Sequence, residues 1–237
     1  VDAAKALEIP GVVAVFTAED LRHNRWGAIV CDQPLLVSDE IGHIDEPVCV
    51  VAAETREALE AARRAIVIEV EEGAPVYDID EAAARGLILY RSQGLSRGDA
   101  VSALARAPHR LSGSLEIGGQ EHFYLESQTS VVYPLEDGQL EVHTSSQHPT
   151  EVQRVCAEVL GLRQHQVVCV VKRMGGAFGG KESQAAPFAA MAALVASRLK
   201  RAARIVLSKD DDMRTTGKRH PFKNRYEVGF DADGRIL

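Results

Sequence analysis

The chain has 237 residues, of which 46% are hydrophobic and 26% are charged. This is the mixture of a folded globular protein with a core, and it excludes an intrinsically disordered chain. The longest fully apolar run, 185–196, is shorter than the about 20 residues that a membrane-spanning helix needs. No signal segment opens the sequence. We therefore expect a soluble, cytoplasmic protein with no membrane partner.

The net charge of −7 is unevenly distributed along the chain. Residues 1–111 carry 19 acidic and 11 basic side chains, whereas residues 112–237 carry 15 and 16. The second part is therefore better able to accept an anionic ligand. Few aromatic residues lie among its basic side chains, so we expect no nucleic-acid partner.

The first part of the chain predicts a small unit of mixed helix and strand. β-branched runs that follow turns predict strands over residues 11–16, 47–53 and 66–70. Thr55 is expected to cap a helix whose apolar stripe is formed by Ala58, Leu59 and Ala62. Residues 86–110 mix Gly, Ser and Arg without periodicity and are predicted to be a linker.

The second part predicts another α+β unit. Alternating or β-branched runs predict strands at 111–117, 129–133, 140–144, 166–172, 205–207 and 226–230. A helix is expected to start at Pro149, with one apolar stripe formed by Val152, Val155, Cys156, Val159 and Leu160. Residues 188–199 are rich in alanine and apolar on all sides, which predicts a buried helix.

A glycine-rich segment, Lys172–Glu182, holds four glycines within six positions, between a predicted strand and a predicted helix. Glycine lets backbone N–H groups approach a ligand closely, and the start of a helix adds partial positive charge. The segment is therefore suited to an anionic cofactor. A structural turn, in which the strand and the buried helix pack closely, is the alternative.

Two nucleotide-binding interpretations of the same segment fit less well. Gly175, Gly180 and Lys181 match a phosphate-binding loop at all but its last position, which is Glu182. A carboxylate supplies no hydroxyl to magnesium and repels phosphates, which disfavours nucleotide hydrolysis. The glycine spacing also differs from that of a dinucleotide-binding fold.

Two further segments accompany the glycine-rich one in order along the chain, Gly118–Glu126 before it and Asp212–Phe222 after it. Together the three closely resemble the molybdenum-binding subunit of bacterial xanthine dehydrogenases, in the molybdenum hydroxylase family that also includes aldehyde oxidases. Residues 10–15 and 47–55 are similar to the small α/β hammerhead domain of that family. The resemblance implies an α+β fold with a hammerhead-like domain, a linker and the first part of a molybdopterin-binding domain, over 1–85, 86–110 and 111–237. Both outer domains are expected to be truncated.

The resemblance also implies roles for five residues. Gln120 matches a glutamine beside a molybdenum oxygen ligand, and Ala177, Phe178 and Gly179 match a loop whose amides approach molybdopterin. Gln120 and Phe178 would thus form the molybdenum environment, and Glu182 matches a glutamate that hydrogen-bonds a purine substrate. The chemistry agrees, because a glutamine amide is a neutral donor and acceptor and backbone amides are fixed donors. The structural alternatives are a buried amide, a core aromatic side chain and a helix-capping carboxylate.

The implied activity is the oxidation of hypoxanthine and xanthine with oxygen from water. Electrons would pass from the molybdenum–molybdopterin cofactor to iron–sulfur clusters and FAD on a partner subunit or domain, in an oligomer. The four cysteines have no spacing typical of such clusters. The general base is expected in later sequence, so no catalytic residue is assigned and the fragment alone is expected to be inactive. A non-catalytic truncated fragment and an aldehyde-oxidase-type hydroxylase are the alternatives.

His122 and Glu126 do not share one face of an extended chain, and we expect structural roles for both.

Overall fold

The computed structural model describes residues 1–90 and 94–237, so residues 91–93 of the predicted linker lie outside the described residues. The chain divides into two compact units that do not follow chain order. The first unit comprises residues 1–69 and 121–218, and the second comprises residues 70–120 and 219–237. Both units mix helices and strands, which confirms the predicted α+β class. These units differ from the predicted ranges 1–85, 86–110 and 111–237, whose boundaries stay a prediction.

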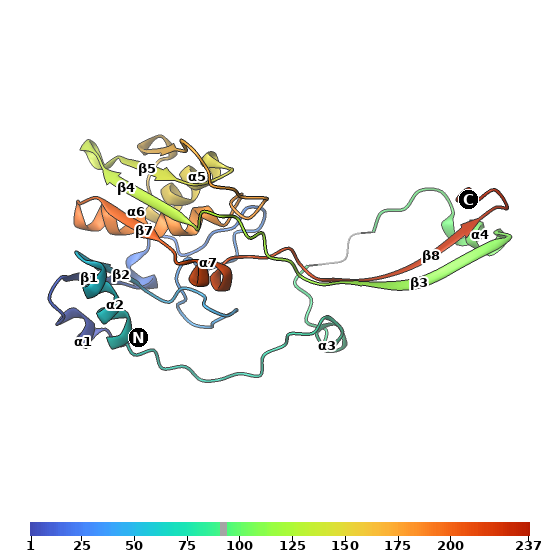
Figure 1. Ribbon diagram of the computed structural model, residues 1–237, viewed down its shortest axis with the longest axis horizontal. Helices are drawn as coiled ribbons and strands as arrows, with labels where there is room; N and C mark the ends of the chain where they lie inside the picture. Colours follow the sequence, from blue (N-terminus) through green and yellow to red (C-terminus); the bar gives the residue numbers. More distant parts are fainter. Residues whose placement is uncertain (91–93) are drawn as a thin grey trace. The chain divides into compact units, whose positions relative to one another are not determined.

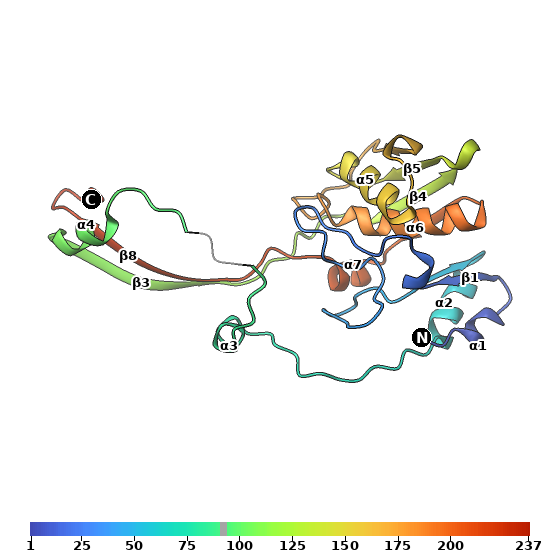
Figure 2. The same ribbon diagram turned by 180° about the vertical axis from the view of Figure 1, so that it is seen from behind.

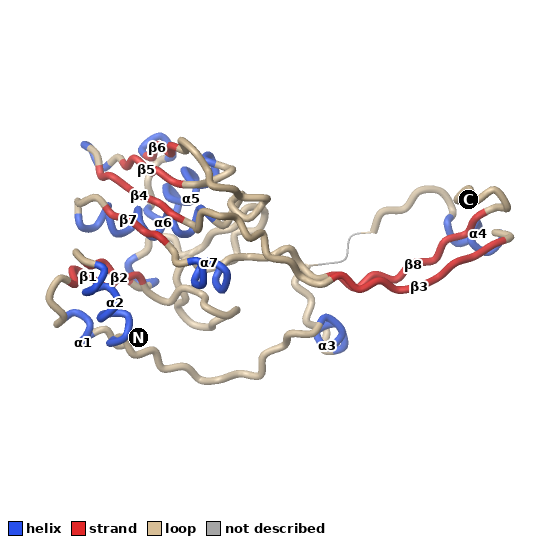
Figure 3. Tube along the Cα trace, viewed as in Figure 1, coloured by secondary structure: helices blue, strands red, loops and turns tan. Residues whose placement is uncertain are grey.

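The first unit is built on a four-stranded sheet with the order β6-β5-β4-β7 (Figures 1 and 3, with β6 labelled in Figure 3). The strands are β4 Thr129–Pro134, β5 Leu140–Thr144, β6 Val167–Val170 and β7 Ala203–Val206. β4 pairs antiparallel with β5 and β7, whereas β5 and β6 are parallel. Helices α5 (Pro149–Leu160) and α6 (Ala185–Leu199) pack on each other and on this sheet (Figure 2). The predicted buried helix is thus confirmed and starts three residues earlier than expected.

The amino-terminal part of the first unit packs into the same core. It contains α1 Ala4–Leu7, β1 Val12–Phe16, β2 Val50–Ala53 and α2 Arg56–Ala65. The predicted cap of α2 is confirmed, because the Thr55 hydroxyl accepts a hydrogen bond of 3.1 Å from the Ala58 amide. Four large side chains join the core formed by α5 and α6, namely Phe16, Trp26, Leu35 and Leu36. Residues 1–69 therefore do not form a compact unit of their own.

The predicted strand at 66–70 is wrong. Only Val67 pairs there, as an isolated bridge with Asp2, and the residues after it extend without a neighbouring strand. A β-branched run favours extended backbone, but a strand also needs a partner, which the local sequence does not reveal.

Four short helices were not predicted: α1, α3 Ile79–Ala84, α4 Ala100–Arg106 and α7 Lys209–Thr215. The last three each start after a side chain that accepts hydrogen bonds from backbone amides; these side chains are Asp78, Asp99 and Ser208 respectively. Because α4 lies within 86–110, that segment is not an irregular linker throughout. Three 3-10 turns complete the inventory, at Ala18–Asp20, Glu136–Gly138 and Gln164–Gln166.

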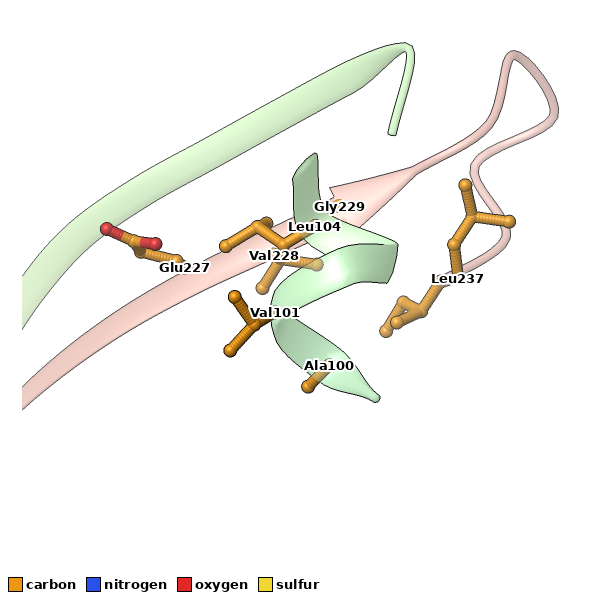
Figure 4. A pocket seen from close by; sticks show the side chains of 8 residues that line it. Ala100, Val101, Leu104, Glu227, Val228, Gly229 and Leu237 are labelled. Carbon is orange, nitrogen blue, oxygen red and sulfur yellow. The ribbon is translucent and has the colours of Figure 1, made fainter. Parts of the chain in front are cut away.

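The second unit is organised around a two-stranded antiparallel ribbon, formed by β3 (His109–Ile117) and β8 (Phe222–Phe230) (Figure 3). The pairing runs from His109 opposite Phe230 to Ile117 opposite Phe222, and β8 starts four residues earlier than predicted. A bridge between Gln120 and Arg219 continues the ladder. Helix α4 packs on β8 and lines a small apolar hollow with Val228 and Gly229 (Figure 4).

Within the described part of the chain, no helix is both long enough and apolar enough to cross a membrane.

Candidate functional site

The glycine-rich segment forms an irregular loop over residues 171–184, between the end of β6 and the start of α6. Its backbone enters the left-handed region at Gly176, Phe178 and Gly179, with φ of 92°, 52° and 94°. Glycine adopts this conformation readily, but Phe178 does so at a cost. Its side chain is 77% exposed, so no packing within the protein compensates this cost. Backbone strain of this kind is typical of ligand-binding loops.

The other two glycines are required by close packing. An added Cβ at Gly175 would lie 2.5 Å from the Cβ of Glu126. At Gly180 it would lie 2.6 Å from Cε1 of Tyr124 and 2.8 Å from Cγ of His122. The loop therefore lies directly against the segment 122–126, which belongs to a different sequence motif.

The backbone amides of the loop fall into two groups. The Gly175 amide donates to Glu126 Oε2 (2.9 Å), and the Gly179 amide donates to Gln147 Oε1 (3.0 Å). Among the residues that the structure describes, the amides of Gly176, Ala177 and Phe178 donate no hydrogen bond. Three consecutive free donors between anchored neighbours are a suitable site for a negatively charged, oxygen-bearing group.

Ala177 is compatible with this arrangement. Its side chain is 6% exposed, and its φ lies outside the left-handed region. Its methyl group is therefore accommodated inside the loop without backbone strain, so this position does not require glycine.

An ion pair between a buried lysine and a partly exposed glutamate lies beneath the loop. Lys181 has no exposed surface, and its Nζ lies 3.1 Å from Glu126 Oε2 and 2.8 Å from Ser145 Oγ. Burial lowers the pKa of Lys181, an effect that Glu126 partly offsets. Burial opposes ionisation of Glu126 too, but hydrogen bonds from Gly175, Ser145 and Lys181 leave the pKa of this carboxyl below its usual value. The Lys181 ammonium is thus occupied by Glu126, which argues against a phosphate-binding loop.

A second buried cluster connects the loop to helix α7. The Tyr124 hydroxyl donates to Asp212 Oδ1 (2.5 Å), and the backbone amide of Gln128 donates to Asp212 Oδ2 (2.6 Å). The side chain of Gln128 also donates to the Gly180 carbonyl at 3.1 Å. Asp212 is 2% exposed. Segment 122–128 therefore contacts both the glycine-rich loop and Asp212, the first residue of the third motif. Residues from all three motifs meet around this loop.

We expect Tyr124→Phe to destabilise the folded chain by about 1.5–3 kcal/mol, the usual cost of removing a hydrogen bond to a charged group. Burial and the Asp212 carboxylate raise the pKa of the Tyr124 phenol. The unfolded chain loses this proton near pH 10, so the contribution is complete below about pH 10 and is lost as pH rises further. Urea unfolding of wild type and variant should therefore differ at pH 8 and converge at higher pH.

Tyr133→Phe is the matched control for this measurement, because the Tyr133 hydroxyl makes no hydrogen bond to a described residue. It should change stability little at either pH. A Tyr124→Phe effect of the same size at both pH values would contradict the role assigned to the phenol.

The structural roles predicted for His122 and Glu126 agree with the structure. Glu126 is the partner of Lys181 and Gly175, and His122 packs against Gly180. Three residues of this site were missed by sequence reasoning, namely Ser145, Gln147 and Arg219. Ser145 and Gln147 follow strand β5 and carry no local signal, whereas Arg219 lies within the third motif.

Glu182 is exposed, and its carboxylate makes no hydrogen bond or ion pair with a described residue. It lies three residues before α6, whose cap position is Gln184, so a helix-capping role for Glu182 is excluded. The exposure of Phe178 likewise excludes a core aromatic role. The structure thus holds Ala177, Phe178, Gly179 and Glu182 together in one loop.

Gln120 belongs to the second unit. It is exposed, which excludes a buried structural amide, and its backbone forms two hydrogen bonds of 3.0 Å with Arg219. Its Oε1 accepts a hydrogen bond of 3.1 Å from the Arg219 guanidinium. With the carbonyl oxygen engaged, the NH₂ group of Gln120 remains as a donor for a ligand.

Comparison with known protein families gives matches over almost the whole chain. A model of the molybdopterin cofactor-binding domain matches residues 82–237. A model of the aldehyde oxidase and xanthine dehydrogenase a/b hammerhead domain matches residues 1–73.

Curated relatives show the same similarity. The xanthine dehydrogenases of Emericella nidulans and Dictyostelium discoideum are 39% and 40% identical to this chain, over 241 and 238 residues. The aldehyde oxidase 2 of Cavia porcellus is 38% identical over 238 residues. All three alignments cover 100% of this chain, which spans 18% of the length of each relative.

Solved structures share the fold. Quinoline 2-oxidoreductase from Pseudomonas putida 86 superposes with a TM-score of 0.85 at 25% identity, over 100% of this chain and 32% of that one. CO dehydrogenase from Oligotropha carboxidovorans superposes with a TM-score of 0.88 at 19% identity, over 100% of this chain and 33% of that one. At such identity the second likeness concerns the fold alone.

Proposed function

Because the chain belongs to the molybdenum hydroxylase family, we propose that it is part of an enzyme that oxidises hypoxanthine and xanthine with oxygen from water. The observation that carries this proposal is the loop itself. It presents three amides and, four residues after Phe178, the carboxylate of Glu182, none of which has a hydrogen-bond partner among the described residues. The xanthine dehydrogenases among the relatives support the choice of a purine substrate.

The donors on this chain fit the molybdenum–molybdopterin cofactor. These donors are the neutral backbone amides of Ala177 and Phe178. Gly179 is the exposed residue that turns the backbone after them. The NH₂ group of Gln120, in the second unit, is a further neutral donor. It is the resemblance that assigns Gln120 and Phe178 together to the molybdenum environment. Fixed neutral donors stabilise negative charge on oxygen without a proton transfer of their own. The bound cofactor supplies the oxidation chemistry, and these residues orient it.

Glu182 is proposed to bind the purine substrate. Its carboxylate accepts hydrogen bonds from ring N–H groups when it is ionised and donates one when it is protonated. Because no described residue competes for it, the side chain is available to a ligand beside the loop. A hydrogen bond that strengthens as charge develops on the ring would lower the barrier as well as aid binding.

The electron acceptors are proposed to lie on other subunits or domains, as iron–sulfur clusters and FAD. The chain spans 18% of the length of its curated relatives, so the complete enzyme would be larger and would carry the general base elsewhere. We propose a cytoplasmic oligomer. An aldehyde-oxidase-type hydroxylase is the second candidate, because aldehyde oxidase 2 of Cavia porcellus is 38% identical to the chain.

Elemental analysis and substrate oxidation by the full-length protein test this function. We expect about one molybdenum per chain, consistent with one tight site, and turnover of hypoxanthine and xanthine. Protein without molybdenum would contradict the enzymatic proposal. Loaded protein that oxidises aldehydes but neither purine would favour the second candidate instead.

A further inference from the structure

We propose that the ion pair between buried Lys181 and Glu126 is a positioning device, which holds the glycine-rich loop so that its amides without acceptors and the Glu182 carboxylate are presented together. The consequence for catalysis rests on the function proposed above. The effect on the loop itself does not, because it follows from contacts within the first unit.

A single oxygen atom joins Gly175 and Lys181, which are called the two ends of the loop from here on. Glu126 Oε2 accepts hydrogen bonds from the Gly175 amide (2.9 Å), from the Lys181 ammonium (3.1 Å) and from the Ser145 hydroxyl. Gly175 and Lys181 flank residues 176–180, the part of the loop that contains the three amides without acceptors. The carboxylate therefore fixes the separation of the two ends.

The carboxyl-terminal end of the loop is fixed a second time by its backbone. The Lys181 carbonyl accepts hydrogen bonds from the Gln147 amide (2.9 Å) and from the Ser146 hydroxyl (3.2 Å). Gln147 Oε1 accepts from the Gly179 amide at 3.0 Å and from the Lys181 amide at 3.4 Å. Lys181 is thus held by both its side chain and its backbone, and Glu182 is the next residue along the chain.

The groups that the loop presents make few contacts of their own. The amides of Gly176, Ala177 and Phe178 have no acceptor among the described residues, and the side chains of Phe178 and of Glu182, just beyond Lys181, are exposed, whereas the Ala177 methyl group is buried. The positions of these groups therefore depend on the anchored residues Gly175 and Lys181. Contacts at the ends are the ones whose loss would move the functional groups.

An ion pair with a buried lysine suits this role better than a role in stability alone. Removing the Lys181 ammonium from water is costly, whereas the Glu126 side chain is 38% exposed. The buried ammonium without its carboxylate would be more costly still. Here the Lys181 ammonium also lies 4.8 Å from the centre of the Tyr124 ring. The pair therefore favours one loop geometry over alternatives that would separate its charges.

Lys181→Met in the full-length protein tests the role, because methionine is similar in length and removes the charge. Hydrogen exchange followed by mass spectrometry should show at least about tenfold faster exchange for peptides that cover the loop, since local opening becomes easier. Peptides from α6 and from β4 should exchange as in wild type. The kcat/KM for xanthine should fall at least about tenfold, because a misplacement of about 1 Å costs about 10²-fold in rate.

Three further variants make the test decisive. Glu126→Gln keeps an acceptor for Gly175 but removes the charge, so it should also accelerate loop exchange, and it replaces Lys181→Met if that variant does not fold. Arg154→Met is the matched control, because it breaks a second ion pair with one buried partner, Arg154–Glu151 at 2.8 Å, in which the glutamate is the buried residue. It should leave loop exchange unchanged. Adding Glu182→Ala to Lys181→Met should cost less activity than Glu182→Ala costs in wild type, since the misplaced carboxylate no longer contributes.

Unchanged loop exchange in both Lys181→Met and Glu126→Gln would overturn the proposal. Faster exchange spread evenly over the whole first unit, or the same loop effect in Arg154→Met, would also overturn it by indicating general destabilisation. Failure of the proposed function is seen separately, as a wild-type protein that does not oxidise xanthine, and the exchange experiment remains decisive in that case.

Discussion

Under the proposed function, the Gly180→Ala variant of the full-length protein is expected to lose molybdenum and at least about 100-fold in kcat/KM for xanthine, because a loop displaced by about 1 Å costs about 10²-fold. The new Cβ would lie 2.6 Å from the Tyr124 ring and 2.8 Å from the His122 ring. Tyr124 is 2% exposed and is held by Asp212, so it cannot move aside. Overpacking of this kind costs about 1–3 kcal/mol, and movement of the loop is the way to relieve it.

Molybdenum per chain, measured by elemental analysis together with steady-state kinetics, checks this expectation. Gly73→Ala is the matched control, because no atom lies within 4 Å of its added Cβ and its φ is outside the left-handed region. It should retain both metal and activity. A Gly180→Ala protein with wild-type molybdenum and kinetics would show that the loop does not contribute to cofactor binding.

The elements that the sequence predicts correctly are those with a local signal. Helix α5 has a proline at its first position and a buried stripe, and α2 has the Thr55 cap, so both follow from their own residues. The strand expected at 66–70 fails because its pairing depends on a neighbour that the fold does not provide. The compact units also could not be predicted, because Phe16 and Trp26 enter a core made by α5 and α6 more than a hundred residues later in the chain.

The sequence indicates the position of the glycine-rich loop but not how the loop is held in place. The composition of the glycine-rich segment indicates a close backbone approach, yet it does not show that Gly175 and Gly180 face Glu126, Tyr124 and His122 rather than a ligand. Lys181 follows the last glycine as in a phosphate-binding loop, and only the structure shows that its ammonium is buried against Glu126. The partner of Lys181 lies 55 residues away along the chain, so no local pattern identifies it.

The structural alternatives to the proposed roles share one expectation that the described residues do not meet. A satisfied amide, a core aromatic and a capping carboxylate would each be engaged with the protein, but Gln120, Phe178 and Glu182 are all exposed. Gln120 alone has a side-chain partner, Arg219, which occupies its carbonyl oxygen. Exposed groups on a rigidly anchored scaffold are typical of sites that a ligand completes.

The Glu182→Ala variant of the full-length protein is expected to lose about tenfold to hundredfold in kcat/KM for xanthine. A hydrogen bond to a charged group is worth about 1.5–3 kcal/mol, and about 1.4 kcal/mol corresponds to a factor of ten in rate. The ratio kcat/KM is the relevant quantity, because it reports the loss of transition-state stabilisation relative to free enzyme and substrate. Molybdenum content should be unchanged, since the Glu182 side chain contacts no other described residue of the loop.

Two comparisons separate substrate recognition from a structural effect in this variant. An aldehyde lacks the ring N–H groups that the carboxylate would bind, so its oxidation should be impaired less than that of xanthine. Glu136→Ala removes another exposed glutamate, which lies in a turn between β4 and β5, and it should leave both activities unchanged. Equal losses on xanthine and on the aldehyde, or loss of molybdenum, would show that Glu182 supports the loop instead of contacting the substrate.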